Sequence, residues 1–168
     1  MPIVIAELLA RQLDDARDWT RKLIADLRDD DWFFQPAGGL AHPLWICGHL
    51  AGAQNTLIHT RCLGESVLDE AFTAHFPIGV PVRSAAEHSY PSVESVLDTM
   101  KATHARTLEG VRGMSDELLA EPASGKDGQP HPHYRDKMGA VSHCARHEAF
   151  HAGQLATIRR LLGKPFLR

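Results

Sequence analysis

The sequence predicts an all-α protein, a four-helix bundle with two long connections, forming a single domain over residues 1–168. Four segments of roughly twenty residues carry apolar side chains at spacings of three and four, the period of an amphipathic helix. Glycine and proline separate these segments, and no alternation of apolar and polar residues predicts a strand. Helices with one apolar face each bury those faces most simply against one another.

The first helix is predicted from Ile5 to the acidic run at residues 29–31, and the second from Pro43 to Gly64. The first stripe consists of Leu9, Leu13, Ala16, Trp19, Leu23 and Leu27. The second consists of Trp45, Ile46, His49, Ala53, Thr56 and Leu57.

The third helix is predicted from residues 91–93 to about Gly113, and the fourth from about Asp136 to Leu162, with Gly163 and Pro165 as stop signals. Residues 65–90 and 115–135 exceed the usual length of helix connections in bundles, so we expect them to carry function or cover one end of the bundle. Within the second connection, residues 116–119 are predicted to form one helical turn.

Charge and cysteine content narrow the class of protein. A formal net charge of −3 gives no general attraction to nucleic acid or anionic lipid, and neither is expected as a partner. The first residues lack the basic region of a signal peptide, and no apolar stretch predicts a membrane span. Three cysteines without a C-x-x-C pair fit reduced thiols, so we expect a cytoplasmic protein.

Histidine is the unusual feature of the composition, with 11 residues, and three of them share the apolar face of the last predicted helix. At about 100° per residue, His143 and His151 lie about 40° to either side of His147, with Cys144 and Gln154 on the same stripe. Each unpaired polar group buried in a core is unfavourable by about 1–3 kcal/mol, so several together need a common partner. A metal ion is such a partner, because histidines four residues apart reach a single ion. Spacing alone does not choose between the pairs 143/147 and 147/151.

The same stretch, His147-Glu148-Ala149-Phe150-His151, matches the H-E-x-x-H pattern of zinc proteases. In those proteases the third ligand follows the second histidine, and the residues after His151 include no His, Asp, Glu or Cys. The match therefore does not predict a protease. Glu148 lies about 100° from His147, at the margin of the stripe. It is a weak catalytic candidate, as is His143, and a solvated or ligand-supporting role fits it equally.

A third metal ligand must then come from an earlier segment. His49 occupies the middle of the apolar face of the second predicted helix. The small residues around it, at positions 48 and 51–53, allow close helix contact or leave room for a ligand. His42 and His104 are competing candidates.

Two motifs resemble the DinB/YfiT-like superfamily of metal-dependent hydrolase and thiol S-transferase bundles. One is Trp45 four residues before the histidine of the stretch Gly-His49-Leu, and the other is His147-x-x-x-His151-x-Gly-Gln. The resemblance covers the whole chain. It implies an up-down-down-up bundle, often a homodimer, with one divalent ion bound by His49, His147 and His151.

The residues around these ligands have less determined roles. His143, one turn before the pair, would support the ligands or line the pocket. Gln154 would bond a ligand imidazole or join two helices, and Trp45 would wall the pocket or pack in the core. Cys144 is a soft ligand, a reactive thiol or a small buried hydrophobe. Residues 131–134, His-Pro-His-Tyr, line a substrate entrance or form a solvated loop.

Three neutral histidines leave open positions on the ion, as in catalytic zinc sites. Relatives that the chain resembles join a low-molecular-weight thiol, such as bacillithiol, mycothiol or glutathione, to an electrophile, or are thiol-dependent maleylpyruvate isomerases. The resemblance thus implies a metal-dependent enzyme that transfers a thiol to a small electrophile through a metal-activated thiolate. The alternatives are a hydrolase using metal-bound hydroxide and a non-catalytic stress-response bundle that binds metal or ligand. Imidazole accepts zinc, nickel and iron alike, so the metal is not predicted.

Overall fold

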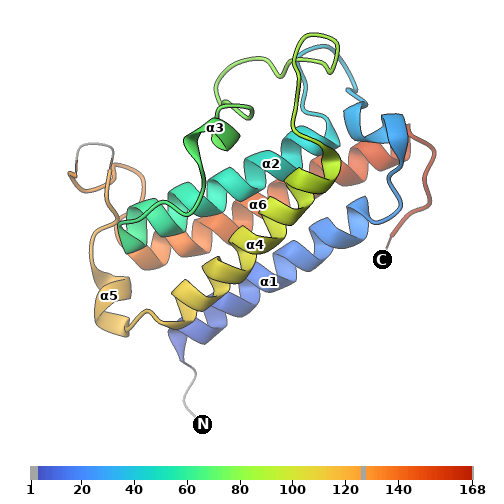
Figure 1. The fold of residues 1–168 in the computed structure, drawn as a ribbon. Coiled ribbons are helices and arrows are strands. Elements are labelled where there is room, and N and C mark those ends of the chain that lie inside the picture. Colours follow the sequence, from blue (N-terminus) through green and yellow to red (C-terminus); the bar gives the residue numbers. More distant parts are fainter. Residues whose placement is uncertain (1–3, 126–127, 168) are drawn as a thin grey trace.

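The computed structural model describes residues 4–125 and 128–167, and four long helical rods dominate it (Figure 1). The rods are α1 (Ile5–Ile24), α2 (Pro43–Gln54) continued by the π-helix η2 (Asn55–Leu63), α4 (Val93–Arg112) and α6 (Lys137–Leu161). Shorter elements are the 3-10 helix η1 (Asp29–Phe33), α3 (Glu70–Thr73) and α5 (Asp116–Ala120). The described residues contain only isolated β-bridges and no strand, which confirms the all-α prediction.

Helix direction and neighbours define the bundle. Helices α1 and α6 run in one direction and α2 and α4 in the other (Figure 1). Helix α1 packs against α4 and α6, and α2 packs against the same two helices. The result is the up-down-down-up arrangement that the family resemblance implies, with α6 in contact with both α1 and α2.

Local sequence explains where the helices begin and end. The side chains of Ser92 and Asp136 accept hydrogen bonds from backbone N–H groups in the first turns of α4 and α6. Gly64 and Gly163 have φ of 80° and 72°, the left-handed conformation that commonly follows a helix. The predicted boundaries of the third and fourth helices are therefore confirmed to within a residue or two.

The first predicted helix differs from the observed one in two respects. Helix α1 ends at Ile24, before Leu27, although Leu27 is still buried. The predicted place of Trp19 in the core is wrong, because this side chain is 46% exposed. Arg17 occupies a buried position on the helix instead, which is possible because its guanidinium is paired inside the bundle.

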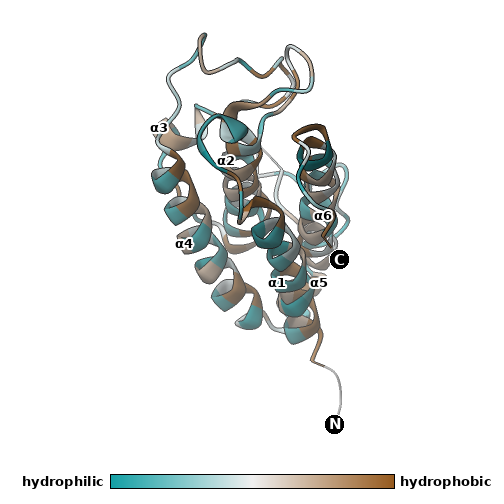
Figure 2. Cartoon of the chain, turned by 90° about the vertical axis from the view of Figure 1, so that its right-hand side faces the viewer, coloured by the Kyte–Doolittle hydropathy of each residue, from teal (hydrophilic) through white to brown (hydrophobic). Residues whose placement is uncertain are grey.

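Each long helix carries both hydrophobic and hydrophilic residues, as Figure 2 shows, and the core that they form has two parts. Between the two hydrophobic clusters, each helix contributes one member of a set of four buried polar residues joined by hydrogen bonds. We call this set the polar layer; it consists of Arg17 (α1), Gln54 (α2), His104 (α4) and Glu148 (α6). Among the described residues, no helix is both long and apolar enough to cross a membrane.

The two long connections lie beside the bundle. The 65–90 connection contains α3 and places Phe76 on Gly48 of α2, where an added Cβ would lie 2.2 Å from the ring. The 115–135 connection begins with the predicted helical turn, α5, and Ser124 donates a backbone hydrogen bond to the carbonyl of Arg61 in η2. Both connections line a cavity along α2 and η2.

Candidate metal centre

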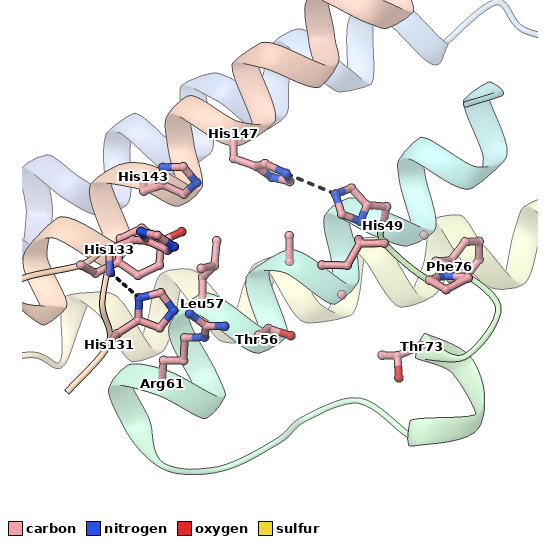
Figure 3. Close-up of a pocket in the computed structure, with 16 residues that line it drawn as sticks. His49, Thr56, Leu57, Arg61, Thr73, Phe76, His131, His133, His143 and His147 are labelled. Carbon is pink, nitrogen blue, oxygen red and sulfur yellow. Dashed lines mark hydrogen bonds between the residues drawn. The ribbon is translucent and has the colours of Figure 1, made fainter. Parts of the chain in front are cut away.

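Three imidazoles meet where α2 packs against α6. The Nε2 atom of His147 lies 3.2 Å from Nε2 of His49 and 3.2 Å from Nε2 of His151. Figure 3 shows the first of these contacts. One nitrogen from each ring falls within 4.8 Å of the other two, so the cluster is able to hold one metal ion. We call this set the three-histidine cluster.

The other candidate ligands lie elsewhere. His143 is on the cavity wall, with its ring centroid 6.0 Å from that of His147. His42 caps the N-terminus of α2, where its Nδ1 accepts the backbone N–H of Trp45. His104 belongs to the polar layer. Of the pairs that spacing left open, the structure brings together the one formed by His147 and His151.

The geometry of the three-histidine cluster fits a divalent ion. Two nitrogens bound to one tetrahedral zinc at about 2.0–2.1 Å lie about 3.3 Å apart. The two separations from Nε2 of His147, each 3.2 Å, match that value, and the third pair of ligand nitrogens, from His49 and His151, lies within 4.8 Å. Nδ1 of His151 bonds Oε1 of Gln154 at 2.7 Å, which assigns the proton to Nδ1 and leaves a lone pair on Nε2. The ring of His49 stacks on Trp45 at 4.7 Å, with 12° between the planes, and its orientation is thereby fixed.

The electrostatics of the cluster also favour metal binding. Burial, followed by the two neighbouring histidines, lowers the pKa of His49 to about 3. Burial and the adjacent His151 lower the pKa of His147 to about 4, and burial lowers the pKa of His151 as well. All three rings are therefore neutral at pH 7, the form that binds metal. Nδ1 of His147 is buried without a hydrogen-bond partner among the described residues.

A cavity of about 440 Å³ opens beside the cluster, with His49 and His147 in its wall. Apolar side chains from η2 and the 65–90 connection form much of the remaining wall, including Leu57, Phe76 and Ile78. The 115–135 connection contributes His131, His133 and Tyr134. Residues 131–134 were considered either as the lining of a substrate entrance or as a solvated loop. Three of these four residues line the cavity, which agrees with the first role.

Glu148 points away from the cavity. Its side chain is 1% exposed, and both carboxylate oxygens accept hydrogen bonds from Arg17 of α1. The solvated role considered for Glu148 is therefore wrong, because its carboxylate is buried in the bundle. Since the carboxylate does not line the cavity, it is not placed as the general base of a zinc protease.

Two further candidates, Cys144 and Trp45, are buried without lining the cavity. Cys144 packs in one hydrophobic cluster, and burial raises the pKa of its thiol well above the usual range. This placement is that of a small buried hydrophobe. Trp45 lies in the other hydrophobic cluster, where it supports the ring of His49 from behind.

Two arginines were missed by the sequence reasoning. A charged residue on the apolar face of the first helix was a readable signal for Arg17 and a buried partner. Arg61 had no such signal, because a regular α-helix at about 100° per residue would place it about 120° from His49. The π-helix takes less rotation per residue, and Arg61 lines the same cavity as His49.

Comparison with known proteins gives a family and a fold. The model of the DinB superfamily matches residues 12–155. A crystal structure described as a conserved protein of locus from Enterococcus faecalis is similar over 97% of this chain and 100% of that chain, with a TM-score of 0.69 and 18% sequence identity. At that identity the similarity supports the fold alone. No curated protein matches the chain.

Proposed function

We propose a function that starts from a shown fact: the chain belongs to the DinB superfamily. In this proposal it is a divalent-metal-dependent enzyme that transfers a low-molecular-weight thiol to a small electrophile. One observation carries this proposal. Three neutral imidazoles converge beside a cavity of about 440 Å³ that is large enough for an organic molecule, and two of them, His49 and His147, line its wall. Three histidine ligands leave coordination positions open for a substrate.

The residues of the chain have distinct parts in this reaction. His49, His147 and His151 would hold the ion, whose positive charge lowers the pKa of a coordinating thiol. The thiol sulfur would then form a bond to the electrophilic carbon, and the displaced group would leave with its electron pair. His143 lines the cavity, and burial lowers its pKa, so the ring is neutral at pH 7 and able to accept the thiol proton.

The cavity wall supports thiol transfer over hydrolysis. Leu57, Phe76 and Ile78 present apolar surface to whatever occupies the cavity. Such a wall binds the carbon skeleton of an electrophile and excludes water, which would otherwise compete with the thiol. We therefore rank the hydrolase and the non-catalytic binder behind the transferase.

Thiol dependence tests the proposal. Untagged protein reconstituted with zinc, nickel or iron is assayed with monobromobimane and chlorodinitrobenzene, with and without bacillithiol, mycothiol or glutathione. We expect turnover that requires both metal and one of the thiols. It should be lost in His151→Ala and kept in His88→Ala, a matched change of a partly buried histidine outside the cavity wall. Ester hydrolysis without thiol would indicate the hydrolase instead, and tight metal binding without any turnover would indicate the binder.

A further inference from the structure

The cavity has a second polar end, away from the three-histidine cluster. Arg61 of η2 lies there with His131 and Tyr134 of the 115–135 connection. The guanidinium of Arg61 lies 5.9 Å from the centroid of the Tyr134 ring, in cation–π contact. Tyr134 in turn stacks on His131 at 4.5 Å, with 20° between the planes. Arg61 is thus supported by an aromatic platform at the cavity wall.

This guanidinium has no acidic partner in the part of the chain that the structure describes. Its side chain makes no ion pair or hydrogen bond there, and neither Asp nor Glu is among the residues that line the cavity. Arg61 is also the one Lys or Arg in the described wall. A positive charge beside apolar walls acts on a bound anion more strongly than it would in open water. The cavity therefore favours a ligand with a single negative group.

The position of Arg61 along the helix sets the length of such a ligand. Residues 49 and 61 are about 18 Å apart along the axis at an α-helical rise of about 1.5 Å per residue, and somewhat less with the π-helical turns. In Figure 3, Leu57 and Thr56 lie between Arg61 and His49. A molecule that contacts both ends must accordingly be elongated and apolar in its middle.

We propose that Arg61 forms a carboxylate subsite for an elongated substrate whose other, reacting end lies at the three-histidine cluster. This assignment rests on the proposed function and names the substrate class of the same cavity. The planar fork of arginine binds a carboxylate through two parallel hydrogen bonds. Phosphate sites commonly add a helix N-terminus, and no first-turn residue of α5 or α6 lines the cavity. A single guanidinium therefore suits a carboxylate better than a phosphate.

A series of matched thiol probes tests the subsite. Mercaptopropionate, mercaptohexanoate and mercaptoundecanoate are each compared with the alcohol of equal length. The alcohol keeps the thiol and the chain but replaces the carboxylate with a neutral group. Binding to chelator-treated protein is measured by calorimetry. Binding to cobalt-loaded protein is measured both by calorimetry and by the thiolate-to-cobalt absorption band. The variants are Arg61→Gln, Arg61→Lys and the control Arg11→Gln, which removes an exposed arginine from α1.

We expect a preference for the acid over the alcohol that rises with chain length and reaches about tenfold once the carboxylate meets Arg61. Arg61→Gln should abolish this preference and Arg61→Lys should keep part of it, while Arg11→Gln leaves it unchanged. Circular dichroism checks that each variant retains its helices. An equal preference at every length would mean general charge attraction and would overturn the subsite, as would a preference that survives in Arg61→Gln. A decyl phosphate that binds tighter than decanoate through Arg61 would overturn the carboxylate assignment.

The two ends of the cavity fail separately in this experiment. If no thiol produces the cobalt band while the Arg61-dependent preference persists in chelator-treated protein, the proposed function fails and the subsite stands. If the band forms equally with acids and alcohols of every length, the metal end stands and the subsite fails.

Discussion

Two groups of polar side chains lie on different faces of α6, about 100° apart around the helix, and they differ in their chemistry. His147 belongs to the three-histidine cluster, and the next residue, Glu148, belongs to the polar layer. In the polar layer, the carboxylate of Glu148 accepts hydrogen bonds from Arg17, and the Arg17 Nη1 donates to the carbonyl of Met100 at 3.0 Å. In the three-histidine cluster, neutral nitrogens face one another at 3.2 Å with no acidic group between them.

The two groups differ in whether their polar atoms find partners within the protein. The polar layer balances its charge internally, and His104 extends it by bonding Gln54 at 3.0 Å and Asp14 at 3.1 Å. Such a network needs nothing from outside and holds four helices in one register. The three-histidine cluster gathers the lone pairs of three neutral rings at one point, and a divalent ion would satisfy all three together.

The largest effect should come from opening the polar layer. Arg17→Met leaves the buried carboxylate of Glu148 without its partner, which should lower the free energy of unfolding by about 3–5 kcal/mol. The double variant Arg17→Met/Glu148→Leu should recover much of this loss, because no buried charge is then unpaired. Urea unfolding of metal-free protein measures both. If Arg17→Met costs no more than the exposed change Arg11→Met, the polar layer does not carry the stability assigned to it.

Metal should stabilise the protein only through the three-histidine cluster. An ion at about 1,000 times its dissociation constant should raise the free energy of unfolding by about 4 kcal/mol. The same ion should leave His49→Ala nearly unchanged, because one of three ligands is missing. Thermal unfolding with and without added zinc gives the comparison. Equal stabilisation of both proteins would place the ion elsewhere.

A smaller effect should follow from the residue behind a ligand. Gln154→Leu removes the acceptor of the His151 Nδ1 proton, which should weaken metal affinity about 10–100-fold. Gln154→Glu keeps an acceptor and should retain most of the affinity. Competition with a chromophoric chelator reports the change. A loss of stability in metal-free Gln154→Leu, with metal affinity unchanged, would instead assign Gln154 to joining helices.

The smallest effect is expected at Cys144. Cys144→Ala removes one sulfur from a hydrophobic cluster, so the free energy of unfolding should fall by about 1 kcal/mol. Metal content and thiol transfer should be the same as in the unchanged protein, since the thiol does not line the cavity. Loss of the ion in this variant would make Cys144 a ligand after all.

The regular parts of the molecule were predictable because periodicity and capping are local. The stripe around His147 and the stop at Gly163 were both readable, and they correspond to α6 as observed. Spacing also located the histidines that form the cluster, but it could not choose between His143 and His151, because each lies one turn from His147. That choice depends on where α2 packs against α6, which the periodicity of a single segment does not determine.

Features that depend on several segments were less accessible. The direction of Glu148 follows from its pairing with Arg17, and 131 residues of chain separate the two. Arg61 reaches the cavity because nine residues of one helix are π-helical, for which the sequence carries no recognised signal. In both cases the local sequence pattern predicted the helix correctly but did not predict where the side chain points.

Metal content is the most direct test of the three-histidine cluster. Protein purified without a His tag is analysed for bound elements before and after chelation and reconstitution, alongside His49→Ala and His143→Ala. The latter variant changes a histidine that lines the cavity without entering the cluster. We predict about one divalent ion per chain in the unchanged protein and in His143→Ala, and little in His49→Ala. No ion after reconstitution, or an ion lost in His143→Ala but kept in His49→Ala, would contradict the assignment of the metal centre.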